Sequence, residues 1–304
     1  MSTLYSDIGE LNALRFHVKQ KKLVPLQQLL ARNTGDHHAL RKGRGMTFSE
    51  VRQYQPGDDV RHIDWRVTAR TQKVHTKVFT EEHERPTVLV TEQSAALFFG
   101  SKVRLKSAQA LNIAALIGWT ALQQHERIGG LCFRGDRHHW IAPNRPQHSL
   151  LQFLEAAVDL QKGLKRPGAC PNVFWHQSLK QLTQTVKPGS QLFLIGDLLD
   201  FDSQAFEWIK KLRSHNEITA IHVFDPLEKQ LPKSGWLSLA RSFISDDLLR
   251  LDSFRDQTRE EYSQGYQARW QNCKQGFRAL AIPLIEVGTD ESPLKSLMQQ
   301  NVIH

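Results

Sequence analysis

Short apolar segments that alternate with longer helical patterns constrain the fold of this 304-residue chain most strongly. Four of them, at residues 87–91, 191–195, 218–224 and 282–287, are rich in β-branched and aliphatic residues. Such runs are typical of strands that are buried on both faces of a parallel sheet. The segments between them repeat apolar residues at three- and four-residue steps, as amphipathic helices do. The sequence therefore predicts an α/β fold with a doubly wound, mostly parallel sheet.

The remaining elements are predicted from the same periodicities and from turn residues. A hairpin is expected across Gly135-Asp136, and a second hairpin between Gly235 and Phe254. Helices are expected at residues 103–124, 149–161, 177–186, 203–214 and 256–280, with a helical stripe on residues 4–18 and a short helix at 25–32. In the long late helix, an aromatic stripe is interpreted as core: Tyr262, Tyr266, Trp270, Cys273 and Phe277.

The densest group of specific side chains lies between Gly43 and Pro86. Pro56-Gly57 suits a type II turn, and Asp58 or Asp59 then caps a short helical turn. Behind that turn, Trp65 is expected to be an apolar anchor, and carboxylates alternate with guanidinium groups closely enough to pair. Two interpretations stay open: a structural ion-pair network that ties a loop to the core, or a preorganised binding surface.

The run Arg52-x-Tyr54-x-Pro56-Gly57-Asp58-Asp59-x-Arg61-x-Ile63-Asp64-Trp65-x-x-x-Ala69-Arg70 closely resembles the signature of the family called domain of unknown function 58. The resemblance continues through residues 77–82 and covers most of the downstream chain. It implies a von Willebrand factor A-like domain in a bacterial protein, often encoded beside a MoxR-type AAA+ ATPase. The predicted organisation is an N-terminal extension with a helical arm and the signature loop (residues 1–86), followed by the von Willebrand A-like domain (residues 87–304). The signature residues that would be structural or would bind a partner are Arg52, Tyr54, Pro56, Gly57, Asp58, Asp59, Arg61, Asp64, Trp65 and Arg70.

The resemblance also implies a place for a metal. Ligand sites of open α/β sheets lie at the carboxyl ends of the strands, and von Willebrand A-like domains carry Asp-x-Ser-x-Ser there, with a further Asp after a later strand. In this chain Glu92 stands at the first position, Ser94 remains, Ala96 replaces the second serine, and Asp197 is the later carboxylate. Mg²⁺ requires near-octahedral oxygen ligands, so this degenerate set is weakened as a magnesium site. The alternative is that Glu92 accepts hydrogen bonds from nearby backbone or pairs with an arginine of the signature.

A formal charge of +9 and a pI near 9.5 invite an acidic partner. Basic residues are frequent in the first 44 positions, but no uninterrupted basic run occurs, so nucleic-acid binding through a basic surface is kept only as an alternative. Cys132, Cys170 and Cys273 are too widely spaced for a disulfide framework or a CxxC metal site. No apolar run is long enough to span a bilayer, and a cytoplasmic location is expected.

Signatures of catalysis and of nucleotide binding are missing from the sequence: GxGxxG, GxxxxGK[ST], GxSxG and HExxH do not occur. The functional hypothesis is therefore a non-enzymatic adaptor or scaffold that works with a MoxR-type AAA+ ATPase. The alternatives are a nucleic-acid-binding module and a Mg-dependent binding or hydrolytic protein that uses Glu92, Ser94 and Asp197.

Overall fold

A six-stranded sheet with the order β10-β7-β6-β3-β4-β5 forms the centre of the larger part of the protein. The structure is a computed structural model that describes residues 5–24, 47–55, 58–80, 85–168, 171–240 and 248–304. The strands are β3 (Thr87–Glu92), β4 (Ile128–Arg134), β5 (Arg137–Asn144), β6 (Gln191–Gly196), β7 (Glu217–Phe224) and β10 (Leu284–Gly288). All neighbours pair in parallel except β5, which lies antiparallel to β4.

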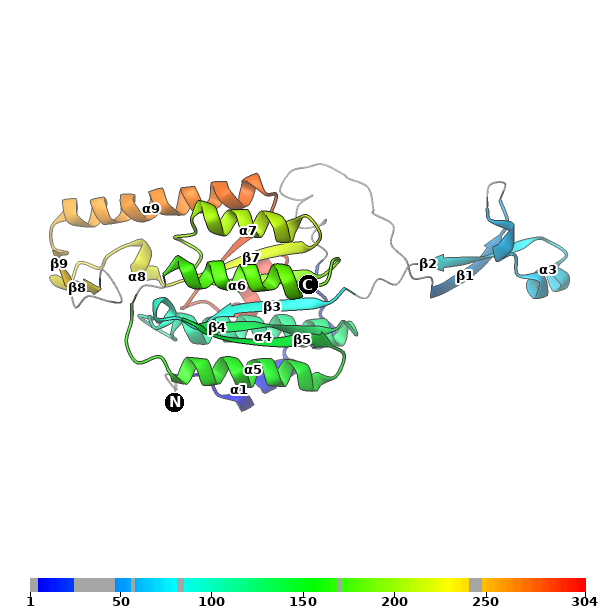
Figure 1. Cartoon of the computed structure of the whole chain (residues 1–304), viewed down its shortest axis with the longest axis horizontal. Coiled ribbons are helices and arrows are strands. Elements are labelled where there is room, and N and C mark those ends of the chain that lie inside the picture. The colour runs from blue at the N-terminus through cyan, green and yellow to red at the C-terminus, as the bar shows by residue number, and fades with distance from the viewer. Residues whose placement is uncertain (1–4, 25–46, 56–57, 81–84, 169–170, 241–247) are drawn as a thin grey trace. The chain divides into compact units, whose positions relative to one another are not determined.

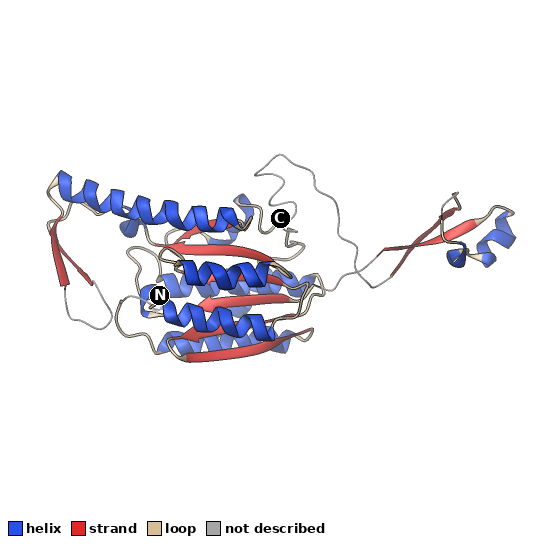
Figure 2. Ribbon diagram, turned by 45° about the horizontal axis from the view of Figure 1, so that its top comes forward, coloured by secondary structure: helices blue, strands red, loops and turns tan. Residues whose placement is uncertain are grey.

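Helices cover both faces of this sheet (Figure 1; Figure 2). Alternate residues of each strand point to opposite faces, so Leu89 belongs to one buried cluster while Val88 and Val90 belong to the other. The first face packs against α1 (Ile8–Ala13), α4 (Lys106–Gln123), α5 (Gln147–Lys162) and α10 (Pro293–Gln299); the second packs against α6 (Asn172–Thr185), α7 (Ser203–Arg213) and α9 (Asp256–Ala279). This arrangement confirms the predicted doubly wound, mostly parallel α/β fold.

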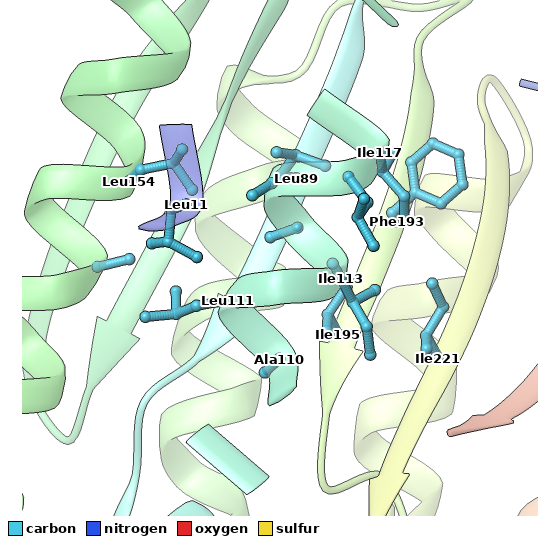
Figure 3. Close-up of a cluster of buried hydrophobic side chains, with 14 of the residues drawn as sticks. Leu11, Leu89, Ala110, Leu111, Ile113, Ile117, Leu154, Phe193, Ile195 and Ile221 are labelled. Carbon is cyan, nitrogen blue, oxygen red and sulfur yellow. The ribbon is translucent and has the colours of Figure 1, made fainter. Parts of the chain in front are cut away.

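The cluster on the first face is aliphatic and fully buried. Figure 3 shows Ile113 and Ile117 of α4 close to Phe193 and Ile195 of β6 and Ile221 of β7. These five side chains are at most 1% exposed. Burial of a Leu, Ile or Phe side chain contributes roughly 1.5–3 kcal/mol, so this contact holds α4 firmly against the sheet. The position of the first turn of α4, which matters for the site below, is fixed by this packing.

The N-terminal segment and the C-terminal segment of the described chain meet. Leu11 and Val18 belong to the core cluster, and the indole nitrogen of Trp119 donates to the carbonyl of Leu11 at 3.0 Å. Lys22 and His304 exchange two backbone hydrogen bonds of 2.9 and 3.0 Å around an isolated bridge between Leu23 and Ile303. Residues 5–24 are therefore integrated into the core rather than attached to it.

By its internal contacts the chain divides into two compact units, residues 1–36 with 85–304, and residues 37–84. We call the second the signature unit. Its described elements are β1 (Thr47–Gln53), a 3₁₀ turn η2 (Val60–His62), α3 (Trp65–Thr71) and β2 (His75–Thr80), and β1 pairs antiparallel with β2. The prediction placed residues 1–86 together in one N-terminal extension, whereas the contacts assign residues 1–36 to the same unit as residues 85–304.

Most predicted elements agree with the structure within a few residues. The hairpin across Gly135-Asp136 joins β4 to β5, and the later hairpin consists of β8 (Trp236–Ala240) and β9 (Leu248–Asp252), which form a sheet of their own. Four residues of the aromatic stripe in α9 are buried, from Tyr266 to Phe277. The short helix predicted at 25–32 lies outside the described residues. Among the described helices, none is both long and apolar enough to cross a membrane.

Candidate functional site

Six polar side chains meet where β3, β6 and β7 end at the carboxyl edge of the sheet. The chain passes from β3 to β4 on one side and later returns to β6 on the other, so β3 and β6 enclose the point where the strand order reverses. We define the strand-end cluster as Glu92, Ser94, Lys106, Asp197, His222 and Glu228. Glu92 ends β3, Asp197 follows β6, His222 lies in β7, Lys106 opens α4, and Glu228 lies in the one-turn helix α8 (Pro226–Lys229).

Lys106 is the cation of this cluster. Its side chain is 0% exposed, and its Nζ lies 2.6 Å from Asp197 Oδ2 and 2.9 Å from Glu228 Oε1. A charged group in the interior requires such partners because the loss of hydration costs several kcal/mol. Asp197 is 91 residues and Glu228 is 122 residues from Lys106 in sequence. The lysine therefore connects the start of α4 to the segments that follow β6 and β7.

Glu92 is fully buried and accepts hydrogen bonds from the protein on both carboxylate oxygens. Ser94 Oγ donates to Oε1, while the backbone amide of Asp197 (3.0 Å) and Trp175 Nε1 (3.3 Å) donate to Oε2. Gly196 makes this possible, because a Cβ at that position would lie 2.7 Å from Glu92 Oε2. Of the two alternatives in the sequence analysis, hydrogen bonding to nearby backbone is the one that the geometry shows.

His222 completes the cluster as a neutral imidazole. The backbone amide of Leu198 donates to His222 Nδ1 at 3.2 Å, so the ring proton is on Nε2. The ring is buried and stacks on Trp270, with centroids 5.0 Å apart. Burial lowers the pKa of His222 to about 4, although Asp197 nearby opposes this shift. The histidine is therefore uncharged at neutral pH.

Within the cluster, burial and neighbouring charges act on the pKa values in opposite directions. Burial works against the ammonium of Lys106, but Asp197 and Glu228 outweigh it and raise its pKa above the ordinary value. Burial would raise the pKa of Asp197, but Lys106 and His222 outweigh it and hold that pKa below its ordinary value. The pKa of Glu228 is raised, chiefly by burial. The core of the cluster is thus an ion pair between Lys106 and Asp197, with Glu228 as a second acceptor.

These residues do not fit a divalent cation. The ammonium of Lys106 is bonded to Asp197, the best remaining carboxylate ligand, and would repel a metal ion there. Both oxygens of Glu92 are engaged by protein donors, and Ala96 offers no side-chain oxygen. In the part of the chain that the structure describes, no group of three or more His, Cys, Asp or Glu residues is arranged to hold a metal. A lysine supplies the positive charge where the resemblance implied Mg²⁺.

In the signature unit the carboxylates of the family signature hold the local backbone. Asp58 accepts from Arg52 at 2.7 Å and from the Gln55 amide at 2.9 Å. Asp59 caps η2 as predicted and lies 3.3 Å from Arg61 Nε. Backbone hydrogen bonds are the main cause that lowers the pKa of each of these carboxyls.

Asp64 plays the same part for the next element. It caps α3 by accepting from the amides of Arg66 and Val67, and it lies 3.7 Å from Lys77 Nζ. Tyr54 donates its backbone amide to the Val74 carbonyl at 2.8 Å, which extends the pairing of β1 with β2. Pro56 and Gly57, and with them the expected type II turn, lie outside the described residues.

The expectation that Trp65 is an apolar anchor is wrong. Trp65 is 70% exposed, and Val60 is 62% exposed. Trp65 is the first residue of α3, and among the described residues of that helix none is buried. Arg61, Arg66 and Arg70 are exposed as well. The carboxylates of the signature therefore serve caps and ion pairs within the unit, Arg52 and Arg61 among their partners, while Trp65 and Arg70 are exposed.

Sequence reasoning missed Lys106, His222 and Glu228. Glu228 had a local signal, because Asp225-Pro-Leu-Glu228 is a capping box that starts α8. Lys106 had a weaker one: a lone cation at the first position of an otherwise apolar helix. The pairing of the two residues had no local signal because 122 residues separate them.

The fold and the two polar regions define a doubly wound α/β protein with a charged, separately folded signature unit. The family model "Protein of unknown function DUF58" matches residues 50–272, and the chain belongs to this family. Uncharacterized protein Mb1516 of Mycobacterium bovis and uncharacterized protein Rv1480 of Mycobacterium tuberculosis are each 28% identical to it over 271 residues, which cover 87% of this chain and 81% of theirs.

Two solved structures resemble the fold. The conserved hypothetical protein BatB from Bacteroides thetaiotaomicron is 16% identical, with a TM-score of 0.41, over 71% of this chain and 95% of that chain. A von Willebrand factor type A structure from Catenulispora acidiphila is 9% identical, with a TM-score of 0.36, over 75% of this chain and 43% of that chain.

Proposed function

We propose that this protein is a non-enzymatic adaptor or scaffold of the cytoplasm that binds a protein partner through the signature unit. The observation that carries the proposal is the exposure of Trp65, which the family signature places at the start of α3 with nothing packed over it. An exposed tryptophan is costly to keep in water, and Trp and Arg are the residues most enriched in the energetic centres of protein interfaces. The resemblance to the family suggests a MoxR-type AAA+ ATPase as the partner.

The charge of the signature unit supports the same proposal and suggests the chemistry of the partner. Asp58, Asp59 and Asp64 are all engaged by backbone amides and cations of the unit itself. Trp65, Arg66 and Arg70 of α3 are all exposed. A complementary partner would offer an apolar pocket with an acidic rim.

Affinity capture with tagged protein from nuclease-treated lysate tests the proposal. We expect the wild-type protein to retain an AAA+ ATPase, identified by mass spectrometry, in buffer with Mg²⁺ and in buffer with EDTA. Trp65→Ala should lose it, because one well-packed interface tryptophan commonly contributes ~2 kcal/mol or more.

Trp236→Ala is the matched control, because Trp236 is 72% exposed but lies in β8, outside the signature unit. It should retain the ATPase. Retention by Trp65→Ala, or equal loss from both variants, would contradict the signature unit as the binding surface. Recovery of nucleic acid before nuclease treatment, at a yield that falls steeply with salt, would favour the nucleic-acid alternative instead.

A further inference from the structure

A pocket of about 410 Å³ lies at the same edge of the sheet as the strand-end cluster but opens elsewhere. It is lined by the β4–β5 turn, by residues 163–166 after α5, by the start of α6, and by Ser94 and Ala95 after β3. Its volume is in the range of small-molecule sites, roughly 300–1,000 Å³.

The lining of this pocket is strongly cationic. Arg134, Arg137, Lys165 and Arg166 contribute to it, against the single carboxylate of Asp136. In the described part of the chain, no carboxylate lies within ion-pair distance of Arg134, Arg137 or Lys165. Elsewhere in the protein, cations of similar exposure do have such partners: Arg85 pairs with Glu217 at 3.0 Å. Within the described residues, Arg134, Arg137 and Lys165 thus bring positive charge to the pocket without a carboxylate in ion-pair contact.

Arg134 is the innermost of these cations and has a place built for it. It is the last residue of β4 and is partly buried. A Cβ on Gly163 would lie 1.8 Å from its Nη1 and 2.3 Å from its Cζ, so the guanidinium rests on the bare backbone at the end of α5. Gly163 has an ordinary helical φ of −79°, so its backbone conformation does not require glycine. A side chain at this position would displace the guanidinium, which is the flexible end of Arg134.

Apolar residues also line the pocket. They are Ala95 and Leu164, which are buried, Phe174, which is partly buried, and Pro171. A partly desolvated guanidinium is stabilised when a carboxylate or phosphate meets its fork of donors. We propose that this pocket binds a small organic anion, whose carboxylate or phosphate group contacts Arg134, Arg137 and Lys165 and whose apolar part packs on Leu164 and Phe174. This site is separate from the signature unit and does not depend on the proposed function.

Calorimetric titration of the full chain with phenyl phosphate and with phenylacetate tests the proposal. Phenol probes the apolar half of the site alone, and inorganic phosphate probes the cationic half alone. We expect at least one aryl anion to bind about tenfold tighter than both phenol and inorganic phosphate, because each half supplies part of the binding free energy. Whether phenyl phosphate or phenylacetate binds more tightly identifies the preferred head group.

Two variants locate the binding. Arg134→Gln removes the innermost charge. Gly163→Ala keeps every charge but displaces the guanidinium of Arg134. Each substitution should lower the affinity for the aryl anion by about tenfold, the effect of one charge-assisted hydrogen bond. Arg278→Gln is the control, since Arg278 is exposed at the end of α9 and does not line the pocket. Circular dichroism confirms that the variants are folded.

Several results would overturn the proposal. They are the absence of saturable binding of either aryl anion, equal affinity for phenol, and unchanged affinity in folded Arg134→Gln. A loss of affinity in Arg278→Gln equal to that in Arg134→Gln would also overturn it, because binding would then follow overall charge rather than this pocket.

Discussion

The strand-end cluster and the signature unit contain similar residues but use them in opposite ways. In the cluster, Lys106 is completely buried, and its charge is met by Asp197 and Glu228. In the signature unit, the side chain of Arg61 is 86% exposed and Trp65 is 70% exposed. The side chains of the first region are buried against one another, whereas the second region has large exposed side chains beside its own ion pairs.

This difference shows why a strand-end position does not by itself define a ligand site. Open α/β sheets do place ligands at the carboxyl ends of their strands. In the strand-end cluster the carboxylates are held by protein donors, and a lysine lies between two of them. Ligand binding is therefore proposed where charge and apolar surface are exposed, in the signature unit and in the Arg134 pocket.

Removal of the buried cation should give the largest effect on stability. Lys106→Met leaves Asp197 and Glu228 together without their counter-charge, and breaking a buried ion pair costs about 3–5 kcal/mol. Urea unfolding followed by circular dichroism measures the loss. Lys102→Met is the control, because Lys102 is 62% exposed and lies 3.6 Å from Asp290; it should cost about 1 kcal/mol or less. Equal losses would erase the distinction between the two regions.

Acid should weaken the cluster through His222. Its pKa falls from 6.5 to about 4 on folding. Between these two pH values, His222 is protonated in the unfolded chain and neutral in the folded chain. Its contribution to stability is present above pH 6.5 and is lost as the pH falls toward 4, at about 1.4 kcal/mol per pH unit, or about 2 kcal/mol between pH 6.5 and 5. His222→Gln should flatten the pH dependence of the free energy of unfolding. His215→Gln, at an exposed position, should leave it unchanged.

The exposed tryptophan should matter little for folding. Trp65→Ala should change the free energy of unfolding, followed by thermal unfolding, by about 0.5 kcal/mol or less, which is the usual range for surface substitutions. A loss of 2 kcal/mol or more would indicate that Trp65 stabilises the protein after all, and a lost partner in the capture experiment would then have a structural cause.

Magnesium should have the smallest effect. A ligand that binds the folded state raises stability by RT ln(1 + [L]/Kd), so a working site would respond to millimolar Mg²⁺. Because Lys106 already neutralises Asp197, we expect no shift in thermal unfolding midpoint between buffers with Mg²⁺ and with EDTA. A clear rise with Mg²⁺ would revive the metal site of Glu92, Ser94 and Asp197.

The sheet could be predicted from the sequence because its strands are buried on both faces. Residues 87–91 and 191–195 are short, largely apolar runs, and their alternation with helices predicts a mostly parallel sheet. The signature unit was harder to predict. The strand β1 and the helix α3 have few apolar residues, so their periodicity is weak, and both fell inside what the sequence suggested was a loop.

The site was predictable only where its signals are local. Glu92, Ser94 and Asp197 follow strands, so their meeting could be predicted from topology. The role of Lys106 could not, because it depends on a carboxylate 122 residues away and on the packing that sets the first turn of α4. Trp65 was assigned to the interior on the usual behaviour of tryptophan, which the lack of apolar partners on α3 overrides.

The backbone bridge between residues 22–24 and 302–304 bears on the order in which the protein can fold during synthesis. Residues 22–24 are made some 280 residues before their partners, so this bridge forms only after residues 302–304 have been synthesised. Contacts of such long range also slow folding. In the signature unit the strands β1 and β2 are close in sequence, so their pairing does not wait for the end of the chain.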